Sequence, residues 1–127
     1  MQTIDIEWQH LDVDGATCRR CGDTGVELVQ AIARLRAECA PKGVNIVFKE
    51  TRLNGDMIDL SNTILINGIS LETILPYIQA STSCCPSCAD LTGRPEQCRT
   101  LVHLGQEYET ISQDLIRQAV CLVCGCC

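Results

Sequence analysis

The chain has 127 residues and a mass of 13.9 kDa, which is the length of one compact domain with a core of its own. Hydrophobic residues make up 46% and charged residues 20%, so the composition excludes a disordered tail. Aromatic residues make up only 3% and the formal net charge is −6, which disfavours nucleic acid and anionic membranes as partners.

The first half of the chain predicts a strand, a long helix and a second strand. Residues 3–11 alternate apolar and polar side chains, which is typical of a half-buried strand. A helical pattern then runs from Cys18 to about Ala40, and Pro41 ends it. Residues 44–53 alternate again and predict the second strand. We expect the apolar face of the helix to consist of Val26, Val29, Ile32, Ala33 and Leu35.

The middle of the chain predicts a β-hairpin followed by an irregular segment. Residues 63–66 are a short apolar run, and Asn67-Gly68 is typical of a two-residue turn because both turn positions need positive φ. Residues 69–75 then provide the partner strand or the start of a short helix. Between about 81 and 98, cysteine, proline, serine and glycine dominate, so we expect a cysteine-rich insertion without apolar periodicity.

The last elements are a strand over residues 100–104 and a helix with Ser112 as its N-cap. The order of elements is that of a thioredoxin-like fold, so the predicted fold class is α/β with the order β-α-β-β-β-α. We expect one domain over residues 1–127, with the insertion at about 81–98 and a thiol tail at 121–127. The apolar face of the last helix is expected to be Leu115, Ile116, Ala119, Val120 and Val123.

Eleven cysteines are the main chemical feature of the chain. They make up about 9% of the residues, and their odd number argues against a fully paired set of disulfides. The first residues lack the basic and apolar segments of a signal peptide, and no apolar run approaches the roughly 20 residues of a transmembrane helix. We therefore expect a cytoplasmic protein, in which clustered cysteines are more often metal ligands or redox groups than disulfides.

The motif Cys18-Arg19-Arg20-Cys21 begins the predicted long helix. Unpaired N–H groups and the positive end of the helix dipole favour a thiolate at Cys18, and the two arginines add positive charge. A low thiol pKa suits Cys18 as a nucleophile, with Cys21 one turn later as the resolving thiol. The same spacing is half of a zinc site, so metal binding remains an alternative for this pair.

The chain also resembles an uncharacterised thioredoxin-like family of prokaryotic proteins, a domain of unknown function. The resemblance covers most of the chain, implies a thioredoxin-like fold and assigns Cys18 and Cys21 to the active-site pair. Thioredoxins place a cis-proline before the third strand, where this chain has Ser61-Asn62. The segments that resemble the family are Trp8-Gln9-His10-Leu11, Thr17-Cys18-Arg19-Arg20-Cys21-Gly22, Ser61-Asn62-Thr63-Ile64-Leu65-Ile66-Asn67-Gly68 and Tyr108-Glu109-Thr110-Ile111, which leads into Leu115-Ile116.

Cys84, Cys85, Cys88 and Cys98 lie in the predicted insertion. Two adjacent cysteines do not readily form an unstrained disulfide, because their Cα atoms are only about 3.8 Å apart. Neighbouring thiolates can instead hold a soft ion, so we expect these four residues to form a local zinc or metalloid site. A second dithiol relay and a passive loop are the alternatives.

Cys121, Cys124, Cys126 and Cys127 place four thiols in the last seven residues. We expect this tail to be coupled to another cysteine site, by passing electrons or delivering a soft metal, because a chain end can move at little cost. The alternative is that Cys121 packs on the helix while the other three fray. Cys39, late in the first helix, is expected to be a small buried side chain.

Two functions follow from these cysteines. The first is thiol–disulfide exchange by a small oxidoreductase that uses Cys18 and Cys21, requires no cofactor and acts on a thiol or disulfide protein partner. The second is binding and transfer of a soft metal or metalloid, such as zinc, mercury or arsenic, by the clustered cysteines of the insertion and tail. A zinc ribbon in the insertion beside a redox dithiol would combine both. His10 and His103 are expected to have structural or solvent-facing roles, although His10 could approach the Cys18 loop.

Overall fold

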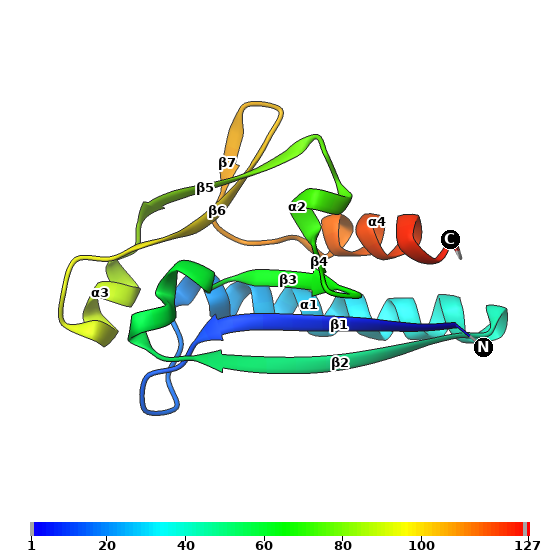
Figure 1. The fold of residues 1–127 in the computed structure, drawn as a ribbon, viewed down its shortest axis with the longest axis horizontal. Helices are drawn as coiled ribbons and strands as arrows, with labels where there is room; N and C mark the ends of the chain where they lie inside the picture. The colour runs from blue at the N-terminus through cyan, green and yellow to red at the C-terminus, as the bar shows by residue number, and fades with distance from the viewer. Residues whose placement is uncertain (1, 126) are drawn as a thin grey trace.

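A four-stranded sheet forms the base of the fold in a computed structural model that describes residues 2–125 and 127 (Figure 1). The strand order is β2-β1-β3-β4. Strand β1 runs parallel to β2 and antiparallel to β3, and β3 pairs antiparallel with β4. The strands are β1 (Gln2–Leu11), β2 (Val44–Leu53), β3 (Thr63–Ile66) and β4 (Ile69–Ser70), so the alternation in the sequence located the two long strands.

Helix α1 (Arg19–Cys39) connects the parallel strands β1 and β2 and packs on the sheet, with Cys18 as its N-cap as predicted. The buried face differs from the prediction, because Val26, Val29 and Ala33 are exposed. The sheet side is taken by a neighbouring stripe in which buried residues recur every three or four positions. This stripe contains Cys21, Thr24, Leu28, Ala31, Ile32, Leu35 and Cys39.

The turn between β3 and β4 confirms the predicted hairpin. Asn67 has a φ of 52° and Gly68 a φ of 80°, the positive values that a type I′ turn requires. Helix α2 (Leu71–Ile74) begins directly after β4. Both alternatives for the segment after the turn, a partner strand and a short helix, are therefore present.

The segment predicted as an irregular insertion instead forms much of a second sheet with the order β5-β6-β7. Its strands are β5 (Ile78–Cys84), β6 (Gln97–His103) and β7 (Gln106–Tyr108), and helix α3 (Pro86–Thr92) lies between β5 and β6. Most residues of β5 are exposed and polar, so no apolar alternation marks this strand in the sequence. Backbone pairing with β6 along its whole length orders it.

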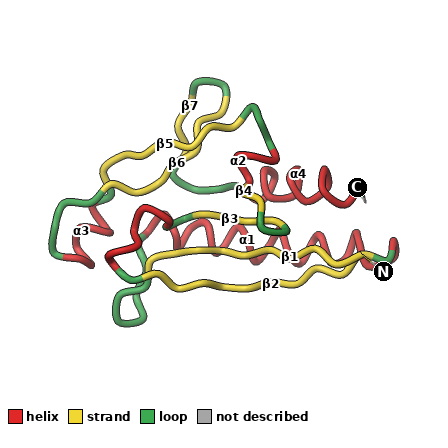
Figure 2. Tube along the Cα trace, viewed as in Figure 1, coloured by secondary structure: helices red, strands yellow, loops and turns green. Residues whose placement is uncertain are grey.

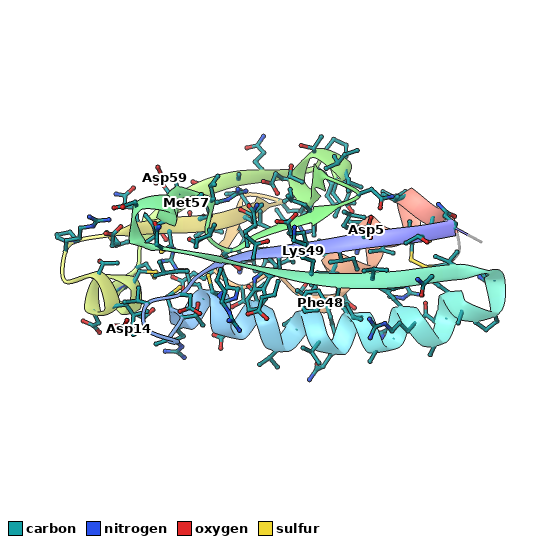
Figure 3. All side chains as sticks on the ribbon, turned by 60° about the horizontal axis from the view of Figure 1, so that its bottom comes forward. Asp5, Asp14, Phe48, Lys49, Met57 and Asp59 are labelled. Atoms are coloured by element: carbon teal, nitrogen blue, oxygen red, sulfur yellow. A yellow bond between two sulfur atoms is a disulfide. The ribbon has the colours of Figure 1, made fainter. Side chains whose placement is uncertain are left out.

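A short 3₁₀ turn follows each of two elements: η1 (Ala40–Lys42) follows α1, and η2 (Gly55–Leu60) follows β2. Helix α4 (Gln113–Cys124) packs beside α1. The Ser112 hydroxyl caps α4 by accepting the Leu115 N–H at 3.3 Å, as predicted. The guanidinium of Arg117 donates to the Glu38 carboxylate at 2.8 Å and fixes α4 against α1. Figure 3 shows side chains filling the space between α1 and β2, Phe48 among them.

The two ends of α1 lie in different surroundings. Figure 2 shows the loop after β1 and helix α3 at the N-terminal end of α1, and the end of α4 near its C-terminal end. Within residues 2–125 and 127, no helix is both long enough and apolar enough to cross a membrane.

Candidate metal centre

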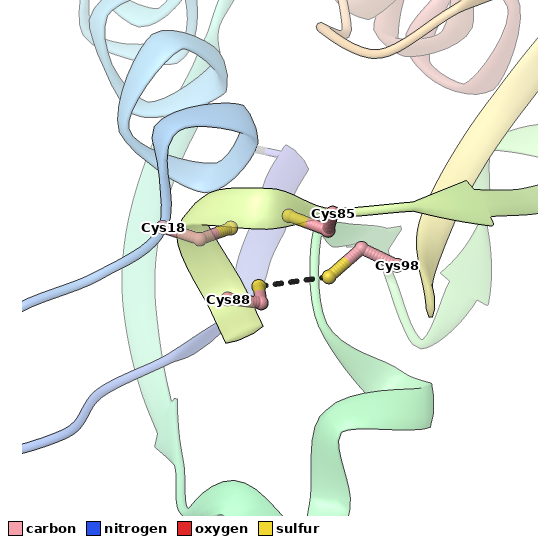
Figure 4. Close-up of side chains that lie close together, drawn as sticks. All are labelled: Cys18, Cys85, Cys88 and Cys98. Carbon is pink, nitrogen blue, oxygen red and sulfur yellow. Dashed lines mark hydrogen bonds between the residues drawn. The ribbon is translucent and has the colours of Figure 1, made fainter. Parts of the chain in front are cut away.

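Four buried cysteines from distant parts of the sequence meet at the N-terminal end of α1 (Figure 4). The sulfur atoms of Cys18, Cys85, Cys88 and Cys98 all lie within 4.8 Å of one another. The four residues are 1%, 2%, 0% and 1% exposed, respectively. The Cys88 and Cys98 sulfurs are 2.8 Å apart, which is longer than the roughly 2.05 Å of a disulfide bond.

The local backbone explains how these thiols converge. Cys18 is the N-cap of α1, and Cys85 is the N-cap of α3, where Pro86 occupies the first turn. Cys88 follows one turn later on α3, and Cys98 lies near the start of β6. The Cys85 N–H donates to the Glu96 carbonyl at 3.0 Å, which closes the β5–α3–β6 connection and brings Cys98 next to α3.

Cys84 lies outside this group, which corrects the predicted set of Cys84, Cys85, Cys88 and Cys98. It ends β5 opposite Gln97, and its side chain is exposed. Successive side chains of an extended segment point in opposite directions, so only one of two adjacent thiols can face the cluster. Cys18 supplies the fourth sulfur instead.

Arg20 is only 4% exposed and joins the start of α1 to the strands that carry the other cysteines. One guanidinium nitrogen donates to the carbonyl oxygens of Cys98 at 3.0 Å and Ser83 at 3.2 Å. The other donates to the Ser83 hydroxyl at 2.9 Å and to the Cys84 carbonyl, and it pairs with the Glu109 carboxylate at 3.1 Å. One buried side chain therefore fixes β5 and β6 against the Cys18 end of α1.

Arg19, the other arginine of the motif, points to the surface rather than into the cluster. Its side chain is exposed and pairs with Asp23 at 3.8 Å. Its backbone N–H donates to the Ser87 hydroxyl at 3.0 Å, so the first turn of α1 also holds α3. The Ser87 oxygen is 3.6 Å from the Cys85 sulfur.

The neighbouring side chains favour the ionised form of the Cys18 thiol. Hydrogen bonds from the thiols of Cys21, Cys88 and Cys98 lower the pKa of Cys18 far below its ordinary value, although burial opposes this effect. The same contacts and burial raise the pKa of those three thiols. The direction for Cys18 agrees with the prediction, but the cause is the neighbouring thiols rather than Arg19 and Arg20.

Cys21 is fully buried beside Cys18 but is not one of the four mutually close sulfurs. The cluster meets solvent on the side of Cys85, where a cavity of about 420 Å³ lies next to it. The cavity is lined by Arg19, Arg20, Cys85, Pro86, Ser87, Asp90 and Glu109.

The tail thiols that the structure describes, Cys121, Cys124 and Cys127, lie outside the Cys18 cluster. Cys121 and Cys127 form a disulfide, and the sulfurs of Cys39, Cys124 and Cys127 lie within 4.8 Å of one another. Cys39 is buried as predicted, and Cys126 lies outside the described residues.

The two histidines lie away from both groups of sulfurs. His10 stacks on Trp8 with ring centroids 4.1 Å apart, and its Nε2 is 2.5 Å from the Glu50 carboxylate. The His103 ring is 5.4 Å from the ring of Tyr77. These contacts correspond to the structural roles expected for both residues.

Comparison with known proteins identifies the family. Residues 4–120 match the family described as a domain of unknown function (DUF2703), and the chain belongs to it. A protein of Archaeoglobus fulgidus, described as an uncharacterized protein, is 36% identical over 117 residues, which cover 89% of this chain and 82% of the relative. No solved structure is significantly similar to the chain. The matched range includes all four cysteines of the candidate centre.

Proposed function

We propose that the chain binds one thiophilic metal ion, with zinc as the best fit, through Cys18, Cys85, Cys88 and Cys98. The observation that carries this proposal is the convergence of the four sulfur atoms within 4.8 Å of one another. Four thiolates at the Zn–S distance of about 2.3 Å would be separated by roughly 3.8 Å in a tetrahedral site. Small side-chain movements would therefore bring the present arrangement to that geometry.

The charge balance around the cluster supports the same function. A zinc ion with four thiolates is an anionic group, and buried anionic groups need nearby positive charge or hydrogen-bond donors. The Arg20 guanidinium donates to the carbonyl of Cys98, one of the ligands, and lies buried beside the cluster. Cys18 also lies at the positive end of the long α1 helix, where a thiolate is favoured.

The burial of the cluster favours a tightly held ion. All four residues are nearly inaccessible, and each ligand belongs to a helix end or strand that the Arg20 and Ser87 contacts support. Sites with four protein ligands and no open position hold a resident ion, whereas catalytic sites keep a position open for substrate. The ion would tie the second sheet to α1.

We also propose that the scaffold is thioredoxin-like. The order β2-β1-β3-β4, with β1 and β2 parallel and β3 and β4 antiparallel, supports this assignment. Cys18 and Cys21 at the start of the first long helix support it as well. The second sheet with α3 would then be the addition that supplies Cys85, Cys88 and Cys98.

Metal content and ligand variants test the proposal. Protein purified without oxygen, with the tail disulfide intact, should hold one zinc ion per chain by native mass spectrometry. Cobalt as a substitute should give the visible bands of tetrahedral thiolate coordination. Cys88→Ala should lose the ion, whereas Cys84→Ala, the exposed neighbour of a ligand, should retain it. Equal zinc affinity in Cys88→Ala and in the unaltered chain would overturn the proposal.

Thiol–disulfide exchange by Cys18 and Cys21 is the second candidate, favoured by the lowered pKa of the Cys18 thiol. Its nucleophile is 1% exposed, so a disulfide substrate would have to enter through the cavity beside Cys85. Cys21→Ser would then accumulate a mixed disulfide at Cys18 with a small disulfide probe. In the metal-binding proposal, zinc would protect Cys18 from that reaction.

A further inference from the structure

A second group of sulfur atoms lies at the other end of α1. The sulfurs of Cys39, Cys124 and Cys127 are mutually within 4.8 Å, and the Cys121 sulfur is bonded to that of Cys127. Four sulfurs are therefore gathered where the last turns of α1 and α4 meet. The first proposal uses none of these residues, so this group requires its own explanation.

The packing of the two helices positions the group. Cys39 is the last residue of α1 and is fully buried, and Cys124 is the last residue of α4. The bidentate contact between Arg117 and Glu38 fixes the two helices side by side, one residue before Cys39. The sulfur of Cys39 therefore belongs to a rigid part of the fold, whereas Cys127 is exposed.

We propose that reduction of the C-terminal tail creates a second soft-metal site from Cys39, Cys121, Cys124 and Cys127. Cys121, Cys124 and Cys127 are all disulfide-bonded, so full reduction of the tail would break both the Cys121–Cys127 bond and the disulfide of Cys124. Each dithiol reductant consumed would become a disulfide itself and leave two protein thiols. A divalent ion would then bind the deprotonated sulfurs, and each coordinating thiol would release its proton to solvent. Exchange with a disulfide oxidant, which would leave as two thiols, would return the Cys121 and Cys127 sulfurs to their bond and expel the ion.

The surface around the disulfide allows this reaction. A cavity of about 470 Å³ lies beside it, so a small reductant and a metal ion can approach. Cys39 contributes a buried sulfur that the Cys121–Cys127 bond does not use, which distinguishes this group from an isolated disulfide. The cavity is lined by Tyr77, Arg117, Gln118, Cys121, Leu122 and Cys127.

The two sites are independent of each other in space. Helix α1 has 21 residues and is therefore about 30 Å long, with Cys18 at one end and Cys39 at the other. Failure of the first site would not remove the second, and variants can separate them. Cys88→Ala changes only the first group, and Cys39→Ser changes only the second.

The test is a zinc titration of the full chain against a chromophoric chelator, with the tail first reduced by a dithiol and then oxidised. The reduced chain should bind one more zinc ion than the oxidised chain. Cys39→Ser should lose that additional ion, with an affinity loss greater than the roughly 10–100-fold caused by removing a supporting partner of a ligand. Cys88→Ala should retain it.

Two further variants keep the test decisive. Cys39 is buried, so circular dichroism must show that Cys39→Ser is folded, and the double variant Cys124→Ser/Cys127→Ser removes the same ion without a substitution in the core. The proposal is overturned if reduction of the tail leaves the zinc stoichiometry unchanged. It is also overturned if folded Cys39→Ser and the double variant both keep the additional ion.

Discussion

The two groups of sulfur atoms at the ends of α1 contain the same residue type in different settings. The four cysteines around Cys18 are nearly inaccessible, and their backbone is held by hydrogen bonds that the Arg20 side chain and the Arg19 N–H donate. The group around Cys39 combines one buried sulfur with an exposed chain end and a disulfide. The two groups have similar numbers of cysteines, so the difference between them comes from the surrounding backbone, which encloses the first group and leaves part of the second at the surface.

The largest effect is expected from Arg20→Ala. This change removes a buried guanidinium and leaves the carbonyls of Ser83 and Cys98 and the Glu109 carboxylate without their partner. Buried hydrogen-bonding groups left without a partner cost about 1–3 kcal/mol each, so the loss of these carbonyl contacts should lower the free energy of unfolding by about 3 kcal/mol or more. Urea denaturation of the metal-free chain measures it.

Arg19→Ala is the matched control for Arg20→Ala, because Arg19 is the exposed neighbour in the same motif. Its free energy of unfolding should change by no more than about 0.5 kcal/mol, as for other surface substitutions. Equal destabilisation by both changes would show that the Cys18 end of α1 does not depend on the Arg20 contacts.

Removal of the metal should have the next largest effect and should act at one end of the molecule. Zinc at 100 times its Kd would stabilise the folded chain by about 2.7 kcal/mol, and chelation should remove that contribution. Amide hydrogen exchange should then accelerate in β5, α3 and β6. Uniform acceleration that includes the core of α1 and α4 would contradict a local role for the ion.

A smaller and pH-dependent effect is expected from Arg117→Gln at the other end. The Arg117 guanidinium lowers the pKa of Glu38 below its ordinary value of about 4.5. Because the unfolded chain takes up this proton at a higher pH than the folded chain, the pair stabilises the fold above that value and loses its effect as the pH falls through the lowered pKa. At pH 7 the melting temperature of the variant should be lower than that of the unaltered chain. At low pH the two melting temperatures should be equal.

Arg34→Gln is the control for that measurement, because Arg34 reaches Asp114 across the same two helices at 3.9 Å between exposed side chains. Exposed pairs contribute little, so its melting temperature should be nearly unchanged at any pH. A pH-independent loss in Arg117→Gln would assign the effect to packing rather than to the ion pair.

The smallest effect on stability is expected from deletion of residues 125–127. In reducing conditions the deletion breaks no disulfide, and the apolar face of α4 remains in place. The free energy of unfolding should stay within about 0.5 kcal/mol of the full chain, while the second zinc ion is lost and the first is kept. Unfolding of the deleted chain would show instead that the tail supports the fold.

The elements that were predicted correctly from the sequence are those marked by a local pattern of side chains. Strand β2, the Asn67-Gly68 turn and the Ser112 cap of α4 were located because each depends on neighbouring residues. The buried face of α1 was predicted only in part: Ile32 and Leu35 are buried as expected, but Val26, Val29 and Ala33 are exposed. Two apolar stripes run along the helix, and only packing on the sheet decides between them. Strand β5 was missed because its polar residues gain their order from pairing with β6.

The candidate centre was predicted only in part for a similar reason. Cys85, Cys88 and Cys98 are close in the sequence, so their grouping was accessible. The addition of Cys18 depends on how the second sheet packs on the end of α1, which no local pattern describes. The role of Arg20 depends on the same packing, because its partners lie more than sixty residues away along the chain.

The length of α1 has a consequence for how two bound ions would influence each other. Each thiolate-bound ion would be a negatively charged group, and about 30 Å of helix separates the two positions. At physiological ionic strength charges are screened over about 8 Å, so neither group would experience the field of the other. Zinc binding at the two ends should therefore be additive, with the affinity of each site unaffected by occupation of the other.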